Sequence, residues 1–134
     1  MANILLVDDE PLVVEALSHA IRSKGHTCVT ASDGVEGLKK FAQTRFDLVI
    51  TDIIMPDKEG IELILQMRRK MPDTKIIAIS GGGRTGGNIE VLKMAEKLGA
   101  MASLKKPIRL DEFFSVLDRC LKAASGSAPA ESLL

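Results

Sequence analysis

Acidic residues stand at the ends of two short apolar segments, where a fold could bring them together. Asp8, Asp9 and Glu10 directly follow the apolar residues 4–7, and Asp52 follows a later apolar run after one threonine. Crowded carboxylates repel one another, and unless one is protonated a divalent cation relieves the repulsion most readily. Oxygen ligands without a neighbouring His or Cys favour Mg²⁺, which keeps some of its waters and leaves room for a phosphoryl oxygen. These acids therefore predict a Mg²⁺-dependent phosphoryl-transfer site.

Two further segment ends supply the donors that such a site needs. Ser80 ends the fourth apolar run, and Lys106 follows the fifth. A carboxylate such as Asp52 attacks phosphorus and forms an aspartyl phosphate when a metal screens its charge and positive donors meet the developing oxyanion. Alone, the acids at 8–10 are typical of a helix start, and a single Asp or a Lys-Pro pair is typical of a turn or loop. Because four segment ends carry the residue types of one chemistry, the joint pattern indicates a site.

Short apolar runs alternate with longer stretches of helical period, the pattern of repeated βα units that build a parallel sheet covered on both faces. The runs predict five strands, at residues 4–7, 27–31, 48–50, 76–79 and 102–104. The first, third and fourth are continuously apolar and are expected in the middle of the sheet, whereas the second and fifth suit its edges. The carboxyl ends of parallel strands lie at one edge of the sheet, so Asp8, Asp9 and Asp52 converge if the first and third strands are neighbours.

The segments between the strands place apolar residues with a period of 3.6, which predicts helices. The predicted helices begin at Pro11, after Asp33, near Ile61, after Asn88 and near Asp111. Residues 124–134 are small and polar without a period, so they are predicted to form a flexible tail or linker remnant. We therefore expect one domain over residues 1–123, followed by this tail.

Composition narrows the classes of function. Among the 134 residues, 18 basic side chains balance 18 acidic ones, which gives no electrostatic footprint for nucleic acid or an anionic membrane and favours a protein partner. The N-terminal segment reaches acids after four apolar residues, and Cys28 and Cys120 are isolated. The first feature predicts no signal peptide or membrane insertion, and the second predicts a reducing compartment. A cytoplasmic location is therefore expected.

The sequence resembles the response-regulator receiver family over residues 3–121. The motifs that carry the resemblance are the runs 4–10 and 47–52, Met55-Pro56 and Gly60, Ile79-Ser80-Gly81, and Gly99-Ala100 leading to Lys106-Pro107. The resemblance implies an α/β fold of the flavodoxin-like type, in which a doubly wound parallel sheet of five strands in the order 2-1-3-4-5 is flanked by five helices.

The resemblance also implies roles for the acids. Asp52 is the expected phosphoacceptor. Asp9, the Asp52 carboxylate and the backbone carbonyl of Ile54 are the expected direct Mg²⁺ ligands, and Asp8 is expected to act through metal-bound water. Lys106 is expected to pair with the phosphoryl group.

Four further expectations concern the switch that would follow phosphorylation. The resemblance implies that Lys106–Pro107 is a cis bond and that Ser80 moves towards the phosphate. Ser103 stands where the family usually has an aromatic or bulky reporter side chain, so the usual aromatic signal to partners is not expected. The glycine-rich residues 81–87 are expected to be mobile without phosphate, because glycine increases backbone freedom.

The function implied is that of a receiver in a two-component or phosphorelay response regulator. A phosphohistidine on a histidine kinase or a histidine phosphotransfer protein donates the phosphoryl group, and the face of the fourth helix, fifth strand and fifth helix then binds a downstream protein. Such a receiver is not a classical enzyme, although it catalyses its own phosphorylation and dephosphorylation. Direct nucleic-acid binding is not expected, because no predicted helix shows a basic recognition face.

Three alternatives stay open at this point. A haloacid-dehalogenase-like phosphatase would carry a second acid where Ile54 stands. A flavin-binding module would need a phosphate-binding loop after the first strand, where the acids at 8–10 repel phosphate without a metal. A pseudo-receiver, which binds proteins independently of phosphorylation, differs only in its response to a phosphodonor.

Overall fold

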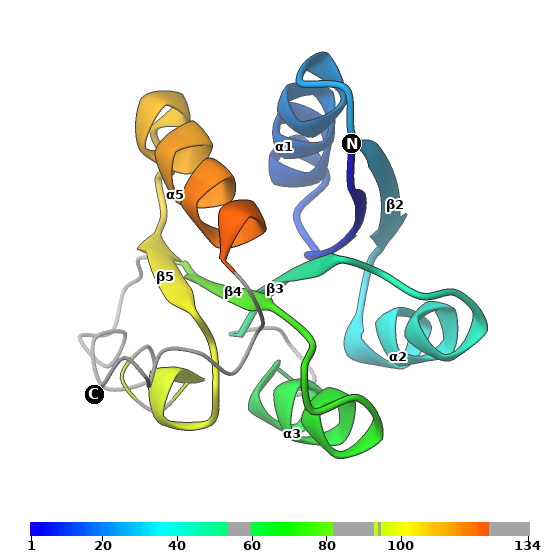
Figure 1. The fold of residues 1–134 in the computed structure, drawn as a ribbon. Helices are drawn as coiled ribbons and strands as arrows, with labels where there is room; N and C mark the ends of the chain where they lie inside the picture. The colour runs from blue at the N-terminus through cyan, green and yellow to red at the C-terminus, as the bar shows by residue number, and fades with distance from the viewer. Residues whose placement is uncertain (54–59, 82–92, 94, 124–134) are drawn as a thin grey trace.

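The computed structural model describes residues 1–53, 60–81, 93 and 95–123, and the strands within them form one parallel sheet. The strands are β1 (Asn3–Val7), β2 (Thr27–Ala31), β3 (Leu48–Asp52), β4 (Ile76–Ser80) and β5 (Ala102–Lys105). They lie in the order β2-β1-β3-β4-β5 (Figure 1). This order confirms the expected doubly wound fold, with the continuously apolar strands in the middle and the two mixed strands at the edges.

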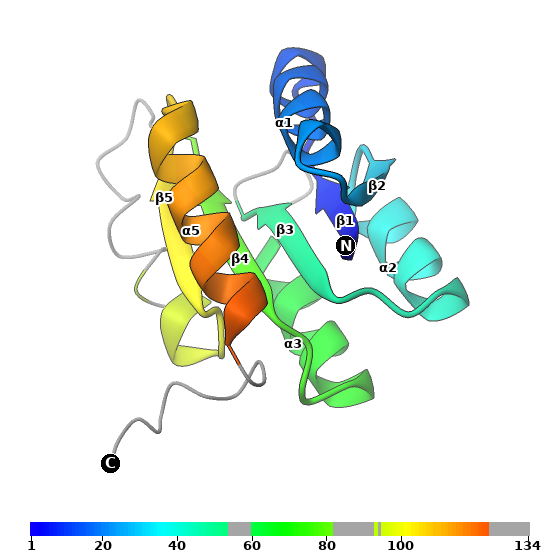
Figure 2. The ribbon, with the colours of Figure 1, turned by 45° about the horizontal axis from the view of Figure 1, so that its top comes forward.

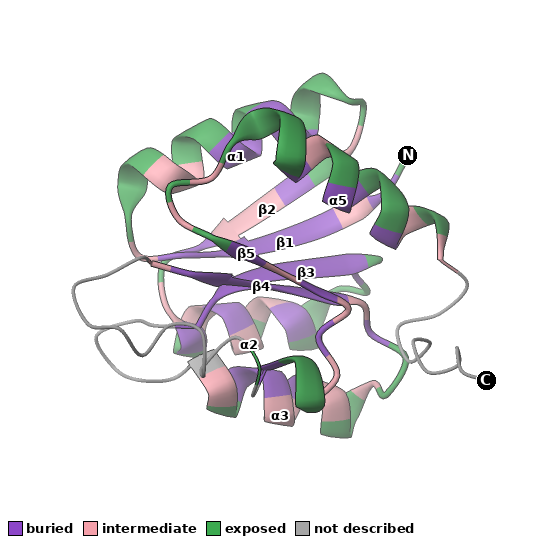
Figure 3. Cartoon of the chain, turned by 90° about the vertical axis from the view of Figure 1, so that its left-hand side faces the viewer, coloured by how far each residue is buried: buried purple, intermediate pink, exposed green. Residues whose placement is uncertain are grey.

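Helices cover both faces of the sheet. The described helices are α1 (Pro11–Ser23), α2 (Gly34–Gln43), α3 (Gly60–Lys70) and α5 (Leu110–Lys122). Figure 3 shows α1 and α5 on one face and α2 and α3 on the other. Of the helix predicted after Asn88, residues 93 and 95–97 are helical, and residues 82–92 and 94 lie outside the described part. The predicted tail 124–134 also lies outside it. Within the described part, no helix combines the length and the apolar character needed to cross a bilayer.

Local signals in the sequence account for the starts and ends of the helices. Pro11 begins α1, and Gly25 follows its end with a φ of 90°, a backbone conformation that glycine adopts without strain. Asp33 caps α2 by accepting a hydrogen bond from the Glu36 amide at 2.8 Å. Pro11 and Asp33 thus set the points at which the chain enters α1 and α2, and Gly25 sets the point at which it leaves α1 for β2.

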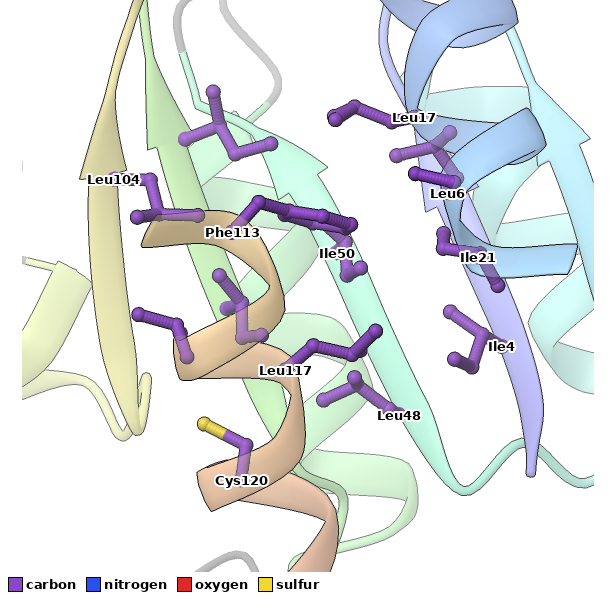
Figure 4. Packing of buried hydrophobic residues seen from close by; sticks show 14 of the residues in the cluster. Ile4, Leu6, Leu17, Ile21, Leu48, Ile50, Leu104, Phe113, Leu117 and Cys120 are labelled. Atoms are coloured by element: carbon purple, nitrogen blue, oxygen red, sulfur yellow. The ribbon is translucent and has the colours of Figure 1, made fainter. Parts of the chain in front are cut away.

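Two apolar cores lie on opposite faces of the sheet, because alternate strand residues point to opposite sides. From β1, Ile4 and Leu6 belong to the core under α1 and α5, whereas Leu5 and Val7 belong to the core under α2 and α3. In the first core, the buried Phe113 of α5 reaches down onto the sheet (Figure 4). Both cores hold the strands in register, and the register places the residues that follow each strand.

Helix α2 approaches β1 closely at Gly37. A β-carbon at this position would lie 2.9 Å from Cγ2 of Val7, the residue that precedes Asp8. The clash should outweigh the better helix propensity of alanine, so we expect Gly37→Ala to lower the free energy of unfolding by about 1 kcal/mol. Urea denaturation measures the change. Adding Val7→Ala should make the double variant lose less than the sum of the two single losses, and strict additivity would contradict the contact.

Candidate functional site

The carboxyl ends of the central strands bring two acids and a lysine together. In the parallel pairing of β1 with β3, Val7 lies opposite Thr51, so the next residues, Asp8 and Asp52, are neighbours. Both are almost fully buried, with 1% and 2% of their surface exposed. Lys106, which follows β5, places its Nζ 3.0 Å from Oδ2 of Asp52 and 3.0 Å from Oδ2 of Asp8. The predicted phosphoacceptor and its predicted partner are therefore in direct contact.

A third acid joins this cluster. Glu10 contacts the Lys106 ammonium through Oε1, and one carboxylate oxygen from each of Asp8, Glu10 and Asp52 lies within 4.8 Å of the other two. Sequence reasoning gave Glu10 no role of its own, although it completes the acidic run after β1. Asp9, predicted as a direct metal ligand, lies outside this trio but lines the same pocket as Asp52 and Lys106.

The other predicted residues have different surroundings. Ser80 is fully buried, and its Oγ has no hydrogen-bond partner within the described structure. The Ser103 hydroxyl donates to Oε2 of Glu96 at 2.9 Å. The Lys106–Pro107 peptide bond is cis, as expected. Ile54, whose carbonyl was predicted to bind the metal, lies outside the described residues, as do residues 82–87 of the glycine-rich segment.

The cluster has an excess of negative charge, because three carboxylates share one ammonium. Burial raises the pKa of Asp8 above its ordinary value, against the lowering effects of hydrogen bonds from the Glu10 amide and from Lys106. Burial by itself would lower the pKa of Lys106, but the hydrogen bonds to Glu10, Asp52 and Asp8 outweigh it and raise the pKa. Lys106 therefore stays cationic, whereas burial makes the ionised form of Asp8 energetically costly.

These residues fit a hard divalent cation. Their ligand atoms are carboxylate oxygens, the type that Mg²⁺ prefers. Among the residues that the structure describes, Oδ2 of Asp8 has no hydrogen-bond donor, although this buried atom lies at ion-pair distance from Lys106. A buried carboxylate oxygen whose hydrogen-bonding capacity is not filled gains from a further cation.

An open pocket of about 700 Å³ leads to the cluster. Asp9, Glu10, Asp52 and Lys106 are among the residues that line it. The apolar part of its wall comes from α1, from the chain leading into α5 and from the first residue of α5; the two helices lie on the same side of the sheet (Figure 2). These residues are Leu12, Val13, Ala16, Leu17, Ile108 and Leu110. A reactant can therefore reach Asp52 from solvent along an apolar surface.

Comparison with known protein families decides what this arrangement is. Residues 4–118 match the response regulator receiver domain. The chain belongs to this family. The receiver assignment takes the place of the phosphatase and flavin-binding alternatives.

Similar receivers occur both within longer regulators and as single domains. The chain is 32% identical to the transcriptional regulatory protein GlrR of Escherichia coli over 129 residues, which are 96% of this chain and 28% of that protein. It is 35% identical to the DNA-binding transcriptional regulator NtrC of Azospirillum brasilense, covering 96% of this chain and 26% of that protein. The chemotaxis protein CheY of Listeria monocytogenes is 28% identical and is covered completely, by 91% of this chain. The receiver thus spans little more than a quarter of the first two relatives.

Solved structures agree with the receiver fold. A response regulator receiver domain protein from Clostridium thermocellum superposes with a TM-score of 0.81 at 27% identity, covering 90% of this chain and 94% of that one. The response regulator TrrA from Thermotoga maritima, solved in complex with Mg²⁺-BeF, gives a TM-score of 0.76 at 33% identity, with 90% and 99% covered.

Proposed function

We propose that this receiver accepts a phosphoryl group on Asp52 from a phosphohistidine of a histidine kinase or histidine phosphotransfer protein. The observation that carries the proposal is the buried contact of the Asp52 carboxylate with the Lys106 ammonium, 3.0 Å apart, beside Asp8. In the transfer, the bond from phosphorus to the histidine nitrogen breaks as one to an Asp52 oxygen forms. Positioning and charge neutralisation supply most of the catalysis, as in other phosphoryl transfers.

Mg²⁺ is the proposed cofactor, and when bound it neutralises the carboxylates and the phosphoryl oxygens. Asp9, the Asp52 carboxylate and the Ile54 carbonyl are the proposed direct ligands, with Asp8 holding a metal-bound water. TrrA, which is similar to this chain, was solved with Mg²⁺-BeF, and this supports the proposal. Lys106 stabilises the charge that develops on the transferred group.

Phosphorylation then alters a protein-binding face. Ser80 turns its buried hydroxyl, which has no partner within the described structure, towards the phosphate. The change passes to the face formed by the fourth helix, β5 and α5. Ser103 lies on this face, where its bond to Glu96 takes the place of the usual aromatic reporter. Water later hydrolyses the aspartyl phosphate in the same site, so the domain catalyses both its phosphorylation and its dephosphorylation without being a classical enzyme.

The proposed partners are proteins: a phosphodonor at the acidic site and a downstream target at the face around β5. We place the domain at residues 1–123, with 124–134 as a tail or linker, in the cytoplasm and without direct contact to nucleic acid or membrane. The pseudo-receiver, a protein-binding domain that does not respond to phosphorylation, is the alternative.

Intact-protein mass spectrometry tests the proposal. After incubation with Mg²⁺ and acetyl phosphate, we expect a mass gain of one phosphoryl group, and no gain in a matched sample treated with a chelator. The bond should be lost at alkaline pH, as an acyl phosphate is. A folded protein that gains no mass with acetyl phosphate, phosphoramidate or a phosphorylated phosphotransfer protein would instead be a pseudo-receiver.

A further inference from the structure

Glu10 stands at the N-cap of α1, but its carboxylate does not cap the helix. Its backbone carbonyl accepts the first helical hydrogen bonds, and its amide donates to Oδ1 of Asp8 at 2.8 Å, while its side chain makes no cap hydrogen bond. The carboxylate reaches instead to the ammonium of Lys106, 96 residues away in the sequence. The side chains that ordinarily satisfy the free amides of the first helical turn from this position are the shorter ones of Asp, Asn, Ser and Thr. The side chain is therefore engaged in the site and not in the helix.

The partners of Lys106 differ in their access to solvent. The side chains of Asp8 and Asp52 are 0% and 2% exposed, whereas that of Glu10 is 57% exposed. The ammonium thus contacts two buried carboxylates and one that is open to solvent. Glu10 also has the longer and more flexible side chain, so it can follow the ammonium if the ammonium moves outward.

A divalent cation at the buried acids repels the ammonium that already lies there. The Lys106 side chain is only 11% exposed, and its ammonium would lose its carboxylate partners if it moved away from all of them. A movement of the ammonium towards Glu10 keeps it paired with a carboxylate. The exposed carboxylate can hold Lys106 while the buried carboxylates take up the cation.

We propose that Glu10 is a positioning residue that receives the Lys106 ammonium when Mg²⁺ binds beside the buried Asp8 and Asp52, and so lowers the cost of metal binding. This inference rests on the proposed function, because it concerns the same metal site. Glu10 acts through Lys106 and need not touch the metal. Without Glu10, the ammonium remains on the buried acids and competes with Mg²⁺.

Titration of the ¹⁵N-labelled domain with MgCl₂, without a phosphodonor, tests the inference by NMR. Glu10→Gln should weaken Mg²⁺ binding by about threefold, the size expected of a partly exposed ion pair. Lys106→Met should strengthen Mg²⁺ binding, because the competing cation is gone. In the Lys106→Met background, Glu10→Gln should have a clearly smaller effect, which is the coupling that a double-mutant cycle isolates.

Glu15→Gln is the matched control. Glu15 is an exposed acid further along α1 that lines the neighbouring pocket with Asp8 and Asp9, and it makes no ion pair with Lys106 in the described structure. Its replacement removes the same charge near the site, so an equal loss of affinity in this variant would overturn the inference. An equal effect of Glu10→Gln with and without Lys106 would also overturn it, because Glu10 would then act directly on the cation.

The Lys106 ammonium gives a second readout that needs no variant of Lys106. Its ¹H–¹⁵N signal, slowed in exchange by its partners, should persist in the Mg²⁺-saturated domain and disappear from Mg²⁺-saturated Glu10→Gln. Persistence of the signal in the variant would contradict the proposal that Glu10 holds the ammonium when Mg²⁺ is bound. If the unmodified domain binds no Mg²⁺ at all, the proposed function fails together with this inference, whereas normal binding without a Glu10 effect removes the inference alone.

Discussion

Asp52→Asn is expected to abolish phosphoryl incorporation and, in the same molecule, to stabilise the metal-free domain. Asparagine has nearly the same shape but is not a nucleophile towards phosphorus. Asp52 and Asp8 are both buried and share one ammonium, so removing one charge relieves their repulsion and leaves Lys106 paired with Asp8 and Glu10. We expect a gain of about 1 kcal/mol, which raises the melting temperature by about 3–5 °C.

Mass spectrometry after acetyl phosphate treatment and calorimetry in chelator measure the two effects. Mg²⁺ should raise the melting temperature of the unmodified domain more than that of Asp52→Asn, because ligand binding stabilises the folded state. Asp73→Asn, at an exposed position between α3 and β4, is the control and should change neither quantity. Phosphorylation of the Asp52→Asn protein would place the acceptor elsewhere. A lower melting temperature would mean that repulsion between the Asp8 and Asp52 carboxylates does not destabilise the metal-free domain.

Phe113→Ala is expected to cause the largest loss of stability. The Phe113 ring is fully buried and lies between the sheet and α5, close to Ile50 and Leu104 (Figure 4). Its removal leaves a cavity that the surrounding strands cannot fill, so the free energy of unfolding should fall by roughly 3–5 kcal/mol. The whole free energy of unfolding of a small domain is only about 5–15 kcal/mol. The urea midpoint should therefore fall markedly, with little change in the dependence of the unfolding free energy on urea concentration.

The adjacent Phe114 provides a matched control. Its side chain is half-buried, and its ring packs under the Lys24 ammonium, which lies 4.6 Å from the ring centroid. Phe114→Ala should cost about 1 kcal/mol, from partial burial and an exposed cation–π contact. Equal losses for the two variants would mean that α5 is not anchored through Phe113.

Much of the fold follows from local patterns. The strand predicted at 27–31 has those bounds in β2, and the other predicted strands differ from the observed ones by one or two residues at an end. Pro11 and Asp33 mark helix starts because proline and an acidic cap act within one turn of the chain. The helix predicted after Asn88 can be compared only at residues 93 and 95–97, which are helical.

The ion pair of Glu10 is a feature that local sequence patterns do not predict. In sequence, the acids at 8–10 are typical of a helix start, and Glu10 does occupy the N-cap of α1. Its side chain nevertheless pairs with Lys106, which comes from beyond β5. No local rule connects residues 96 positions apart.

The sequence by itself determined the types of residue at the strand ends, and with them the expectation of Mg²⁺ and phosphoryl chemistry. Strand periodicity and caps are local, so they can be read along the chain. Only the tertiary structure decided that Asp8, Glu10 and Asp52 share one ammonium, and that Asp9 stands outside this trio. Those distances depend on the strand order, the register of β1 with β3 and the packing of α1 and α5 on the sheet, which arise from contacts between distant segments.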